Sequence, residues 1–311
     1  MPLTYVSGNI FESPAETLVN TVNTVGAMGK GIAYKFKLLY PEMFSRYRSM
    51  CERGELTVGR LFLYRTEHKS VLNFPTKEHW RNPSKVVYLE EGLKTFVRTY
   101  ETVGIHSVAF PALGCGHGGL DFKTQVQPMM ETWLRKVACR VFIYPHKNSY
   151  QLPEHRNIRQ MKKWLRSTPS DLSFVEVWED LREVLSRRTT YTPFTTTTKY
   201  SATLTTDPAG IRIERSRKRW HILYDDLLDF WQQLRSFGFA SSRFAPSNRS
   251  RDISYIAPIF AELQYIEPVR IASGYADDSD FDRYAEYALQ FIPPPSDIAT
   301  TDQFDLLPAA G

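Results

Sequence analysis

Cysteines, zinc-ligand patterns and long apolar runs are scarce in this sequence. Its three cysteines, Cys51, Cys115 and Cys139, lie far apart along 311 residues, and a sparse, odd number favours reduced thiols over a disulfide framework. No cysteines and histidines have the spacing of zinc ligands, so we expect neither a metal nor another cofactor. No apolar run is long enough to cross a bilayer, and the first residues lack a signal-peptide pattern. We therefore expect a cytoplasmic protein that does not contact a membrane.

Two glycine-rich loops stand where an anion could bind. An apolar stretch, residues 18–22, leads into the glycines of residues 26–31, and a second, residues 107–111, leads into those of residues 114–119. The first loop matches neither the Walker pattern nor the G-x-G-x-x-G fingerprint. A loop between a strand and a helix nevertheless presents backbone N–H groups that can bind phosphate. The alternative is a plain strand-to-helix turn in which glycine serves only the backbone.

The charge is unevenly distributed. Residues 1–150 carry 19 Lys and Arg against 12 Asp and Glu, and residues 151–220 carry 14 against 8. Residues 221–311 carry 6 against 14, which leaves a net charge of +5 for the chain. The basic front favours an anionic partner, nucleic acid included. Solvated surface charge is the alternative, and for the acidic tail we prefer it.

Strands alternate with helices in the first half. Strands are predicted at 3–6, 18–22, 59–64, 71–75, 107–111 and 140–144, and helices at 32–39, 42–52, 83–100 and 122–138. This order predicts a layered α/β domain whose ligand crevice lies at the carboxyl ends of the strands. Both glycine loops follow strands, so both are expected at that edge.

The second half is interpreted as a smaller domain, either of the α+β class or like a winged helix. We expect a linker at 145–153, helices at 154–166, 170–185, 224–237 and 253–263, and a hairpin pairing 200–205 with 211–214. Ser170 and Asp171 are expected to cap the second of these helices. The second half also contains a basic patch (215–220), an acidic run (277–282) and a Pro-rich tail from 293. The predicted domains are 1–148 and 149–311. The second could dock a partner, bind DNA through 212–220, or support the fold.

Four motifs resemble those of macrodomains, and more narrowly those of the DarG antitoxins. They are Gly8-Asn9-Ile10, residues 19–33, Asn73-Phe74-Pro75-Thr76-Lys77, and residues 114–121. DarG macrodomains remove ADP-ribose from thymidine bases in DNA that the partner toxin DarT has modified. The resemblance covers residues 1 to about 146. It implies a three-layer α/β/α fold around a mixed sheet.

The resemblance assigns a role to each motif. It places Asn9 and Ile10 beside the adenine, although many macrodomains have Asp where Asn9 stands, and Asn20 and Asn23 beside the distal ribose. It also implies that the two loops hold the diphosphate from opposite sides. The residues implied in ADP-ribose binding are Asn9, Ile10, Asn20, Asn23, Gly26, Met28, Gly29, Lys30, Gly31, Ile32, Thr76, Gly114, Cys115, Gly116, His117, Gly118, Gly119 and Leu120.

Lys77 is the first candidate for catalysis, because the resemblance puts an essential lysine there. Such an amine can protonate the departing base or, with a lowered pKa, attack the anomeric carbon. Asn23, Asn20 and Asp121 are further catalytic candidates, and Asp121 is alternatively a helix cap.

Trp80 and Arg81 are predicted to contact DNA, with a loop anchored by Trp80 as the alternative. The sequence thus favours an antitoxin-type glycohydrolase with a DarT-like partner. A non-catalytic ADP-ribose-binding module and a toxin-sequestering protein remain as alternatives.

Overall fold

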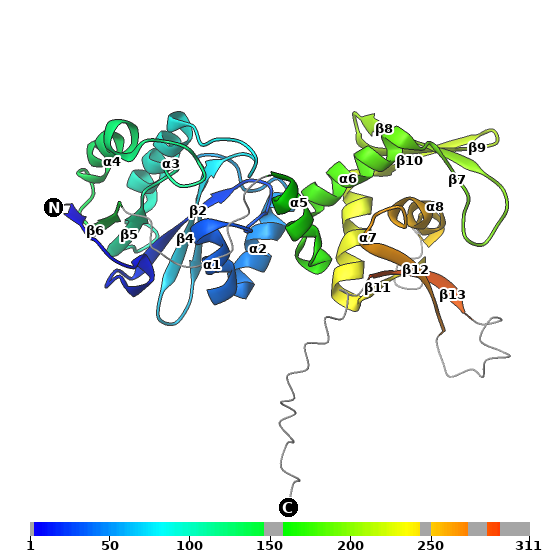
Figure 1. Ribbon diagram of the computed structural model, residues 1–311, viewed down its shortest axis with the longest axis horizontal. Coiled ribbons are helices and arrows are strands. Elements are labelled where there is room, and N and C mark those ends of the chain that lie inside the picture. Colours follow the sequence, from blue (N-terminus) through cyan, green and yellow to red (C-terminus); the bar gives the residue numbers. More distant parts are fainter. Residues whose placement is uncertain (1–2, 146–157, 243–249, 273–284, 293–311) are drawn as a thin grey trace, which may run out of the picture.

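The computed structural model describes residues 3–145, 158–242, 250–272 and 285–292, which form two regions side by side (Figure 1). We call residues 3–145 the first region and the later ranges the second region. The expected linker after Pro145, the acidic run 277–282 and the tail from 293 lie outside the described residues. Among the described residues, no helix is long and apolar enough to cross a membrane.

A six-stranded mixed sheet forms the middle of the first region. Its order is β1-β6-β5-β2-β4-β3, and only the β3–β4 pair is antiparallel. The strands are β1 (Thr4–Tyr5), β2 (Thr17–Asn23), β3 (Phe62–Arg65), β4 (Ser70–Lys77), β5 (Ser107–Pro111) and β6 (Arg140–Tyr144). The central strands β2 and β4 are buried along most of their length on both faces, as expected for parallel strands covered by helices on either side.

Helices cover both faces of this sheet. The first face carries α1 (Gly31–Leu39) and α2 (Pro41–Glu52), and the other carries α3 (Val86–Thr99) and α4 (Gln127–Leu134) (Figure 1). Successive strand residues point to opposite faces, so Leu18 packs with Phe36 of α1 whereas Val19 packs with Leu93 of α3. The predicted three-layer α/β/α fold is confirmed.

The second region combines four helices with two antiparallel sheets. The helices are α5 (Ile158–Arg166), α6 (Phe174–Arg187), α7 (Tyr224–Phe237) and α8 (Ser250–Phe260). One sheet has the order β10-β9-β8-β7, with β7 (Thr190–Tyr191), β8 (Tyr200–Thr206), β9 (Ala209–Arg215) and β10 (Lys218–Leu223). The other has the order β11-β13-β12, with β11 (Phe239–Ala240), β12 (Ile266–Ile271) and β13 (Glu286–Phe291). The α+β class is confirmed, with two sheets in place of the single hairpin of a winged helix.

The predicted start of α6 is wrong. Ser170 and Asp171 lie in a short 3-10 turn, Pro169–Asp171, and the helix begins at Phe174 with Ser173 as its N-cap. Asp171 instead pairs with Lys37 of α1, 2.7 Å away. The Asp171 carboxylate, which the local sequence predicted as a helix cap, therefore forms an ion pair between the two regions instead.

Two predicted helix ends also shift. The helix expected at 122–138 begins with a π-helical turn, Phe122–Val126, and α4 ends at Leu134. The helix expected at 253–263 covers Ser250–Phe260 and includes Pro258.

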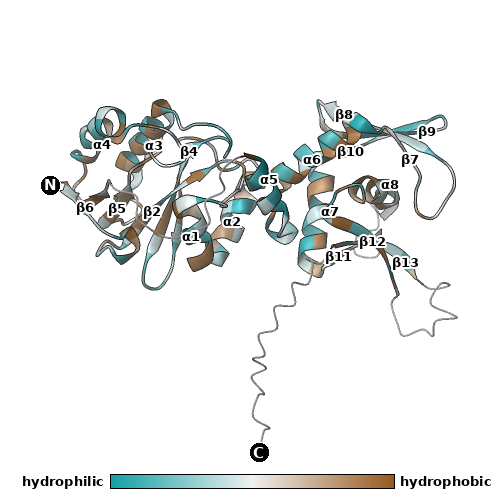
Figure 2. Cartoon of the chain, in the orientation of Figure 1, coloured by the Kyte–Doolittle hydropathy of each residue, from teal (hydrophilic) through white to brown (hydrophobic). Residues whose placement is uncertain are grey.

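Polar side chains join the two regions. The carboxylate of Glu52, fully buried at the end of α2, accepts a hydrogen bond from the backbone N–H of Phe174 (2.8 Å) and pairs with Arg235 of α7 (2.9 Å). Arg48 donates to the carbonyl of Ser170 (2.8 Å). Helix α5, which lies between the two regions, is largely hydrophilic (Figure 2). Charge pairing and hydrogen bonds therefore set how the regions sit together.

Candidate active site

Two asparagines on neighbouring strands meet at the middle of the sheet. Asn20 of β2 lies opposite Asn73 of β4, and its Nδ2 donates to the Asn73 Oδ1 (2.9 Å). Both side chains are fully buried, and Asn20 Oδ1 has no hydrogen-bond partner within the part of the chain described. A buried acceptor without a partner is costly, and a ligand hydroxyl could satisfy it. Asn73 was given no role by the sequence, although its position in the Asn-Phe-Pro-Thr-Lys motif was the available signal.

Asn23 shapes the first glycine loop. Its Nδ2 donates to the carbonyl of Ala27 (2.6 Å), and its Oδ1 accepts from the N–H groups of Val25 (3.1 Å) and Ala27 (3.2 Å). The Tyr47 hydroxyl donates to the carbonyl of Asn23 (2.8 Å). These bonds hold the chain as it leaves β2, so the side chain determines the shape of the loop. Contact of Asn23 with a substrate stays a prediction.

Lys77 ends β4 at the carboxyl edge of the sheet, beside Asn23. Thr76 before it is buried, and the lysine itself is 9% exposed. Its Nζ donates to the backbone carbonyl of His117 in the second glycine loop (2.9 Å). Burial, with the nearby charge of Lys30, lowers the pKa of Lys77. The amine is therefore held between the two loops and is easier to deprotonate than a surface lysine.

The first loop leads directly into α1. Lys30 is the N-cap residue of α1, and its side chain makes no capping hydrogen bond. The first amides of a helix without a side-chain cap can donate to an anion, which the helix dipole also favours. Gly26, Met28, Gly29, Gly31 and Ile32 lie along this segment, as the sequence placed them.

The second loop folds tightly on itself and reaches the first. A Cβ atom on Gly118 would lie 2.2 Å from the carbonyl oxygen of Gly114 and 2.3 Å from Ser84 Oγ, so only glycine fits there. A Cβ atom on Gly31 would lie 3.3 Å from the ring of His117. The two glycine loops, with Cys115, Gly116, Gly119 and Leu120 in the second, therefore meet at one edge, as the sequence predicted because both loops follow strands.

Three other predicted residues have local partners. Asn9 caps a 3-10 turn by accepting from the N–H of Phe11 (2.9 Å), and Ile10 is buried in the core that contains Phe36. Asp121 accepts from the N–H of Thr124 (2.7 Å). The expectation that Asp121 caps a helix is confirmed. A catalytic role for Asp121 and adenine contacts of Asn9 and Ile10 stay predictions.

Trp80 and Arg81 engage α6 of the second region. Trp80 Nε1 donates to Glu176 Oε1 (2.7 Å), and Arg81 pairs with Glu179 (2.9 Å). His79 Nε2 lies 3.4 Å from each of these two carboxylates. The three groups are close enough to share a cation, but the Arg81 guanidinium already supplies positive charge to them. Trp80 thus anchors its loop, as the alternative reading held, and DNA contact by Trp80 and Arg81 stays a prediction.

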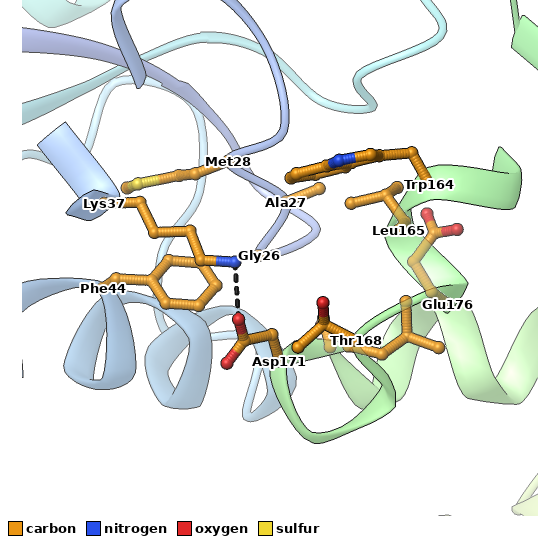
Figure 3. Close-up of a pocket in the computed structure, with 12 residues that line it drawn as sticks. Gly26, Ala27, Met28, Lys37, Phe44, Trp164, Leu165, Thr168, Asp171 and Glu176 are labelled. Carbon is orange, nitrogen blue, oxygen red and sulfur yellow. Dashed lines mark ion pairs between the residues drawn. The ribbon is translucent and has the colours of Figure 1, made fainter. Parts of the chain in front are cut away.

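A pocket lies where the two regions meet (Figure 3). Gly26, Ala27 and Met28 of the first loop line one side of it, and Trp164 and Leu165 of α5 line another. The ion pair between Lys37 and Asp171 spans it. Neither Lys77 nor the second loop lines this pocket, so it is distinct from the edge at which the two glycine loops meet. Nothing in the sequence of the first loop indicated that α5 packs beside it.

Similar proteins share the first region. The Macro domain family matches residues 19–129. A DNA ADP-ribosyl glycohydrolase of Mycobacterium tuberculosis is 46% identical over 147 residues, which cover 46% of this chain and 42% of that protein. A DNA ADP-ribosyl transferase–DNA ADP-ribosyl glycohydrolase fusion protein of Thermosipho africanus is 39% identical over 161 residues, covering 46% of this chain and 41% of that protein. The solved macrodomain of Mycobacterium tuberculosis DarG is 45% identical, with a TM-score of 0.45, and the match covers 47% of this chain and 98% of that one. The chain thus spans less than half the length of the curated relatives it matches.

Proposed function

Because the first region of this chain is a Macro domain, we propose that the crevice between its two glycine loops binds ADP-ribose. Backbone amides of residues 26–31 and 114–119 hold the diphosphate from two sides. Asn20 and Asn23 lie beside the distal ribose, and a ribose hydroxyl donates to the Asn20 Oδ1 that lacks a partner among the described residues. Asn9 and Ile10 lie on the adenine side.

The reaction we propose is removal of ADP-ribose from thymidine bases of DNA. The Mycobacterium tuberculosis relative is named a DNA ADP-ribosyl glycohydrolase, and the choice of thymidine rests on the resemblance to the DarG antitoxins. In this hydrolysis the glycosidic C–N bond breaks, the oxygen of a water molecule bonds to the anomeric carbon, and the base gains a proton. The chain would thereby reverse the modification made by a DarT-like ADP-ribosyltransferase. The Thermosipho africanus relative supports this pairing, because its name joins a transferase and a glycohydrolase.

The observation that carries this proposal is the environment of Lys77. Its amine is buried, has a lowered pKa and sits against the second glycine loop. A charged Lys77 can protonate the departing base. A neutral one can attack the anomeric carbon as the base leaves, and water then hydrolyses the bond between lysine and ribose. Both routes need the amine near the glycosidic bond, where the two loops would place the distal ribose.

The test is hydrolysis of a single-stranded oligonucleotide that carries ADP-ribose on thymidine. We expect wild-type chain to release ADP-ribose, and Lys77→Ala to lose turnover by a factor of about 100 or more while still binding ADP-ribose. Lys94→Ala, which changes an exposed lysine of α3, is the control. Equal turnover by wild type and Lys77→Ala removes Lys77 from catalysis. Binding of ADP-ribose without turnover by the wild type would leave a non-catalytic ADP-ribose-binding module.

A second function, sequestering the toxin, is favoured by the independent core of the second region. Buried residues such as Val177, Ile213, Trp231 and Phe260 form a core without residues of the first region. We propose residues 1–148 as the catalytic domain and 149–311 as an accessory domain that binds the toxin or DNA. If the Lys77→Ala chain still protects cells from the toxin and copurifies with it, sequestration contributes.

The cellular setting follows from the same proposal. A chain that repairs DNA modified inside a bacterium works in the cytoplasm, where its three cysteines remain thiols.

A further inference from the structure

Helix α5 of the second region packs directly on the first glycine loop. A Cβ atom on Gly29 would lie 2.3 Å from Met161 Cε and 2.7 Å from Trp164 Cζ3. Trp164 also meets Tyr34 of α1 edge to face, with ring centroids 5.2 Å apart. Figure 3 shows Trp164 and Ala27 lining the same pocket. The absence of a side chain at position 29 therefore makes room for α5 as well as for any ligand.

Ion pairs fix the position of α5. Arg166, its last residue, pairs through two nitrogens with Asp180 of α6, both at 2.7 Å, and lies 3.3 Å from Glu176. Lys162, one turn earlier, pairs with Glu183 (3.2 Å). The Tyr265 hydroxyl donates to Asp180 (3.0 Å). A bidentate arginine pair is geometrically specific, so α5 has little freedom to shift along α6.

Glu176 connects this helix pair to the segment that carries Lys77. Its buried carboxylate accepts from Trp80 Nε1, three residues after Lys77, at 2.7 Å. Although burial alone would raise the pKa of Glu176, the nearby His79 ring, the hydrogen bond from Trp80 and the charge of Arg166 lower it below its usual value. One charged carboxylate thus joins the end of β4 to α5, and through α5 to the first glycine loop.

We infer that the second region completes the ADP-ribose site, with Met161 and Trp164 as positioning residues that hold the first glycine loop in its ligand-binding shape. Glu176 fixes the position of that loop relative to Lys77, through its contacts with Trp80 and Arg166. The inference rests on the proposed function of the crevice. A loop that is already ordered loses less conformational entropy when it binds a ligand. Loss of the α5 contacts should therefore weaken ADP-ribose binding more than it slows the chemical step.

The first experiment compares Trp164→Ala, Trp164→Phe and wild-type full-length chain by calorimetric titration with ADP-ribose and by steady-state kinetics. We expect Trp164→Ala to raise Kd and KM by about tenfold with kcat nearly unchanged. Trp164→Phe, which keeps an aromatic ring against Gly29, should stay close to wild type. Trp133→Ala, on the distant helix α4, is the matched control. Thermal unfolding of each variant separates loss of fold from loss of affinity.

Two outcomes are distinguishable in that experiment. If wild type binds ADP-ribose and Trp164→Ala binds it equally well, the inference is overturned and the proposed function stands. If wild type does not bind ADP-ribose, both the proposed function and the inference that rests on it are wrong. Glu176→Gln, which keeps an acceptor for Trp80 but removes the charge that pairs with Arg166, should also raise Kd.

A double-mutant cycle tests the contact itself. Gly29→Ala should weaken binding strongly in the wild-type background, since its methyl group displaces either the loop or α5. In a Met161→Ala/Trp164→Ala background the same change should cost much less, because the space is open. Neighbouring residues that share a contact give such non-additive effects. If Gly29→Ala weakens ADP-ribose binding by the same factor in both backgrounds, glycine is required at position 29 by the ligand alone. That result would overturn the inference.

Discussion

Lys77 Nζ donates a hydrogen bond to the backbone carbonyl oxygen of His117, 2.9 Å away. The two residues are 40 positions apart and belong to different motifs. The bond joins the end of a central strand to the second glycine loop. It also holds the amine close to the place where both loops meet, which is where the proposed function puts the glycosidic bond.

The pH dependence of the reaction should report on Lys77. Burial first, and the charge of Lys30 second, lower the pKa of this amine. Lys30→Gln removes the second cause, so the pKa rises toward that of an exposed lysine. If the neutral amine is required, kcat/KM rises with pH through that pKa; if the ammonium is required, kcat/KM falls.

In both cases the limb of the profile should move to higher pH in Lys30→Gln. The sign of its slope identifies the route. Lys30 is itself a candidate ligand contact, so its substitution can also change the magnitude of kcat/KM. The readout is therefore the pH at which kcat/KM changes, and not the maximum value of kcat/KM. A limb that stays at the same pH as in wild type would contradict this account of Lys77, and Lys94→Gln serves as the control.

Two glycines of the second loop should respond differently to alanine. A Cβ on Gly118 would collide with the Gly114 carbonyl at 2.2 Å, whereas one on Gly116 would meet no atom within 4 Å. We expect Gly118→Ala to destabilise the fold by roughly 1–3 kcal/mol. Gly116→Ala should unfold at the wild-type temperature yet bind ADP-ribose less tightly, since its methyl group enters the space proposed for the diphosphate.

Thermal unfolding and ADP-ribose titration of both variants check this pair. Wild-type affinity in Gly116→Ala would move the diphosphate away from that residue. Wild-type stability in Gly118→Ala would mean that the loop can open without cost.

Much of this arrangement follows from local sequence. The helix expected at 224–237 has those limits in the structure, and Gly238 ends it in the left-handed conformation with φ of 77°. The two glycine loops and Lys77 come together because the loops follow, and Lys77 ends, strands in the parallel part of one sheet. Strand direction alone therefore predicts that they share an edge.

The contacts between the regions could not be predicted in this way. Helix α5 is rich in Arg and Lys and has apolar residues at helical spacing, but that spacing does not indicate that Met161 and Trp164 pack on Gly29. The Glu176–Trp80 hydrogen bond joins residues 96 positions apart. Asp171 follows a local capping pattern and pairs with Lys37 instead. Long-range partners override local preference at these positions, and they are the positions that tie the second region to the site.

The buried pair between Glu52 and Arg235 should contribute strongly to stability. The Glu52 side chain is 0% exposed and that of Arg235 is 11% exposed, at 2.9 Å from each other. Arg235→Ala leaves the buried carboxylate with the Phe174 N–H and the charge of Arg48 among the described residues, which should cost about 3–5 kcal/mol of unfolding free energy. The control is Arg53→Ala, which breaks the exposed ion pair between Arg53 and Glu55 and should leave stability unchanged. Urea unfolding measures the stability of both variants. An unfolding midpoint of Arg235→Ala equal to that of the wild type would show that the pair between the regions contributes nothing.

Cys115 lies in the second glycine loop but should be chemically unreactive. Burial, with a smaller contribution from Asp121, raises the pKa of its thiol to about 11. At pH 7 the thiolate fraction is then roughly one in ten thousand, against a few per cent for an ordinary cysteine. Cys115→Ser should therefore keep full turnover, and alkylation of the wild type by iodoacetamide should accelerate only at strongly alkaline pH.

Asp121→Asn gives the sign of the electrostatic effect on that thiol. Removing a nearby negative charge lowers the pKa of Cys115, so alkylation at a fixed alkaline pH should become faster. Peptide mapping assigns the label, because burial also raises the pKa of Cys51 to about 12 and that of Cys139 to about 11. Rapid labelling of Cys115 at neutral pH, or loss of turnover in Cys115→Ser, would instead make the thiol a participant in the reaction and would require a base that activates it within the second loop.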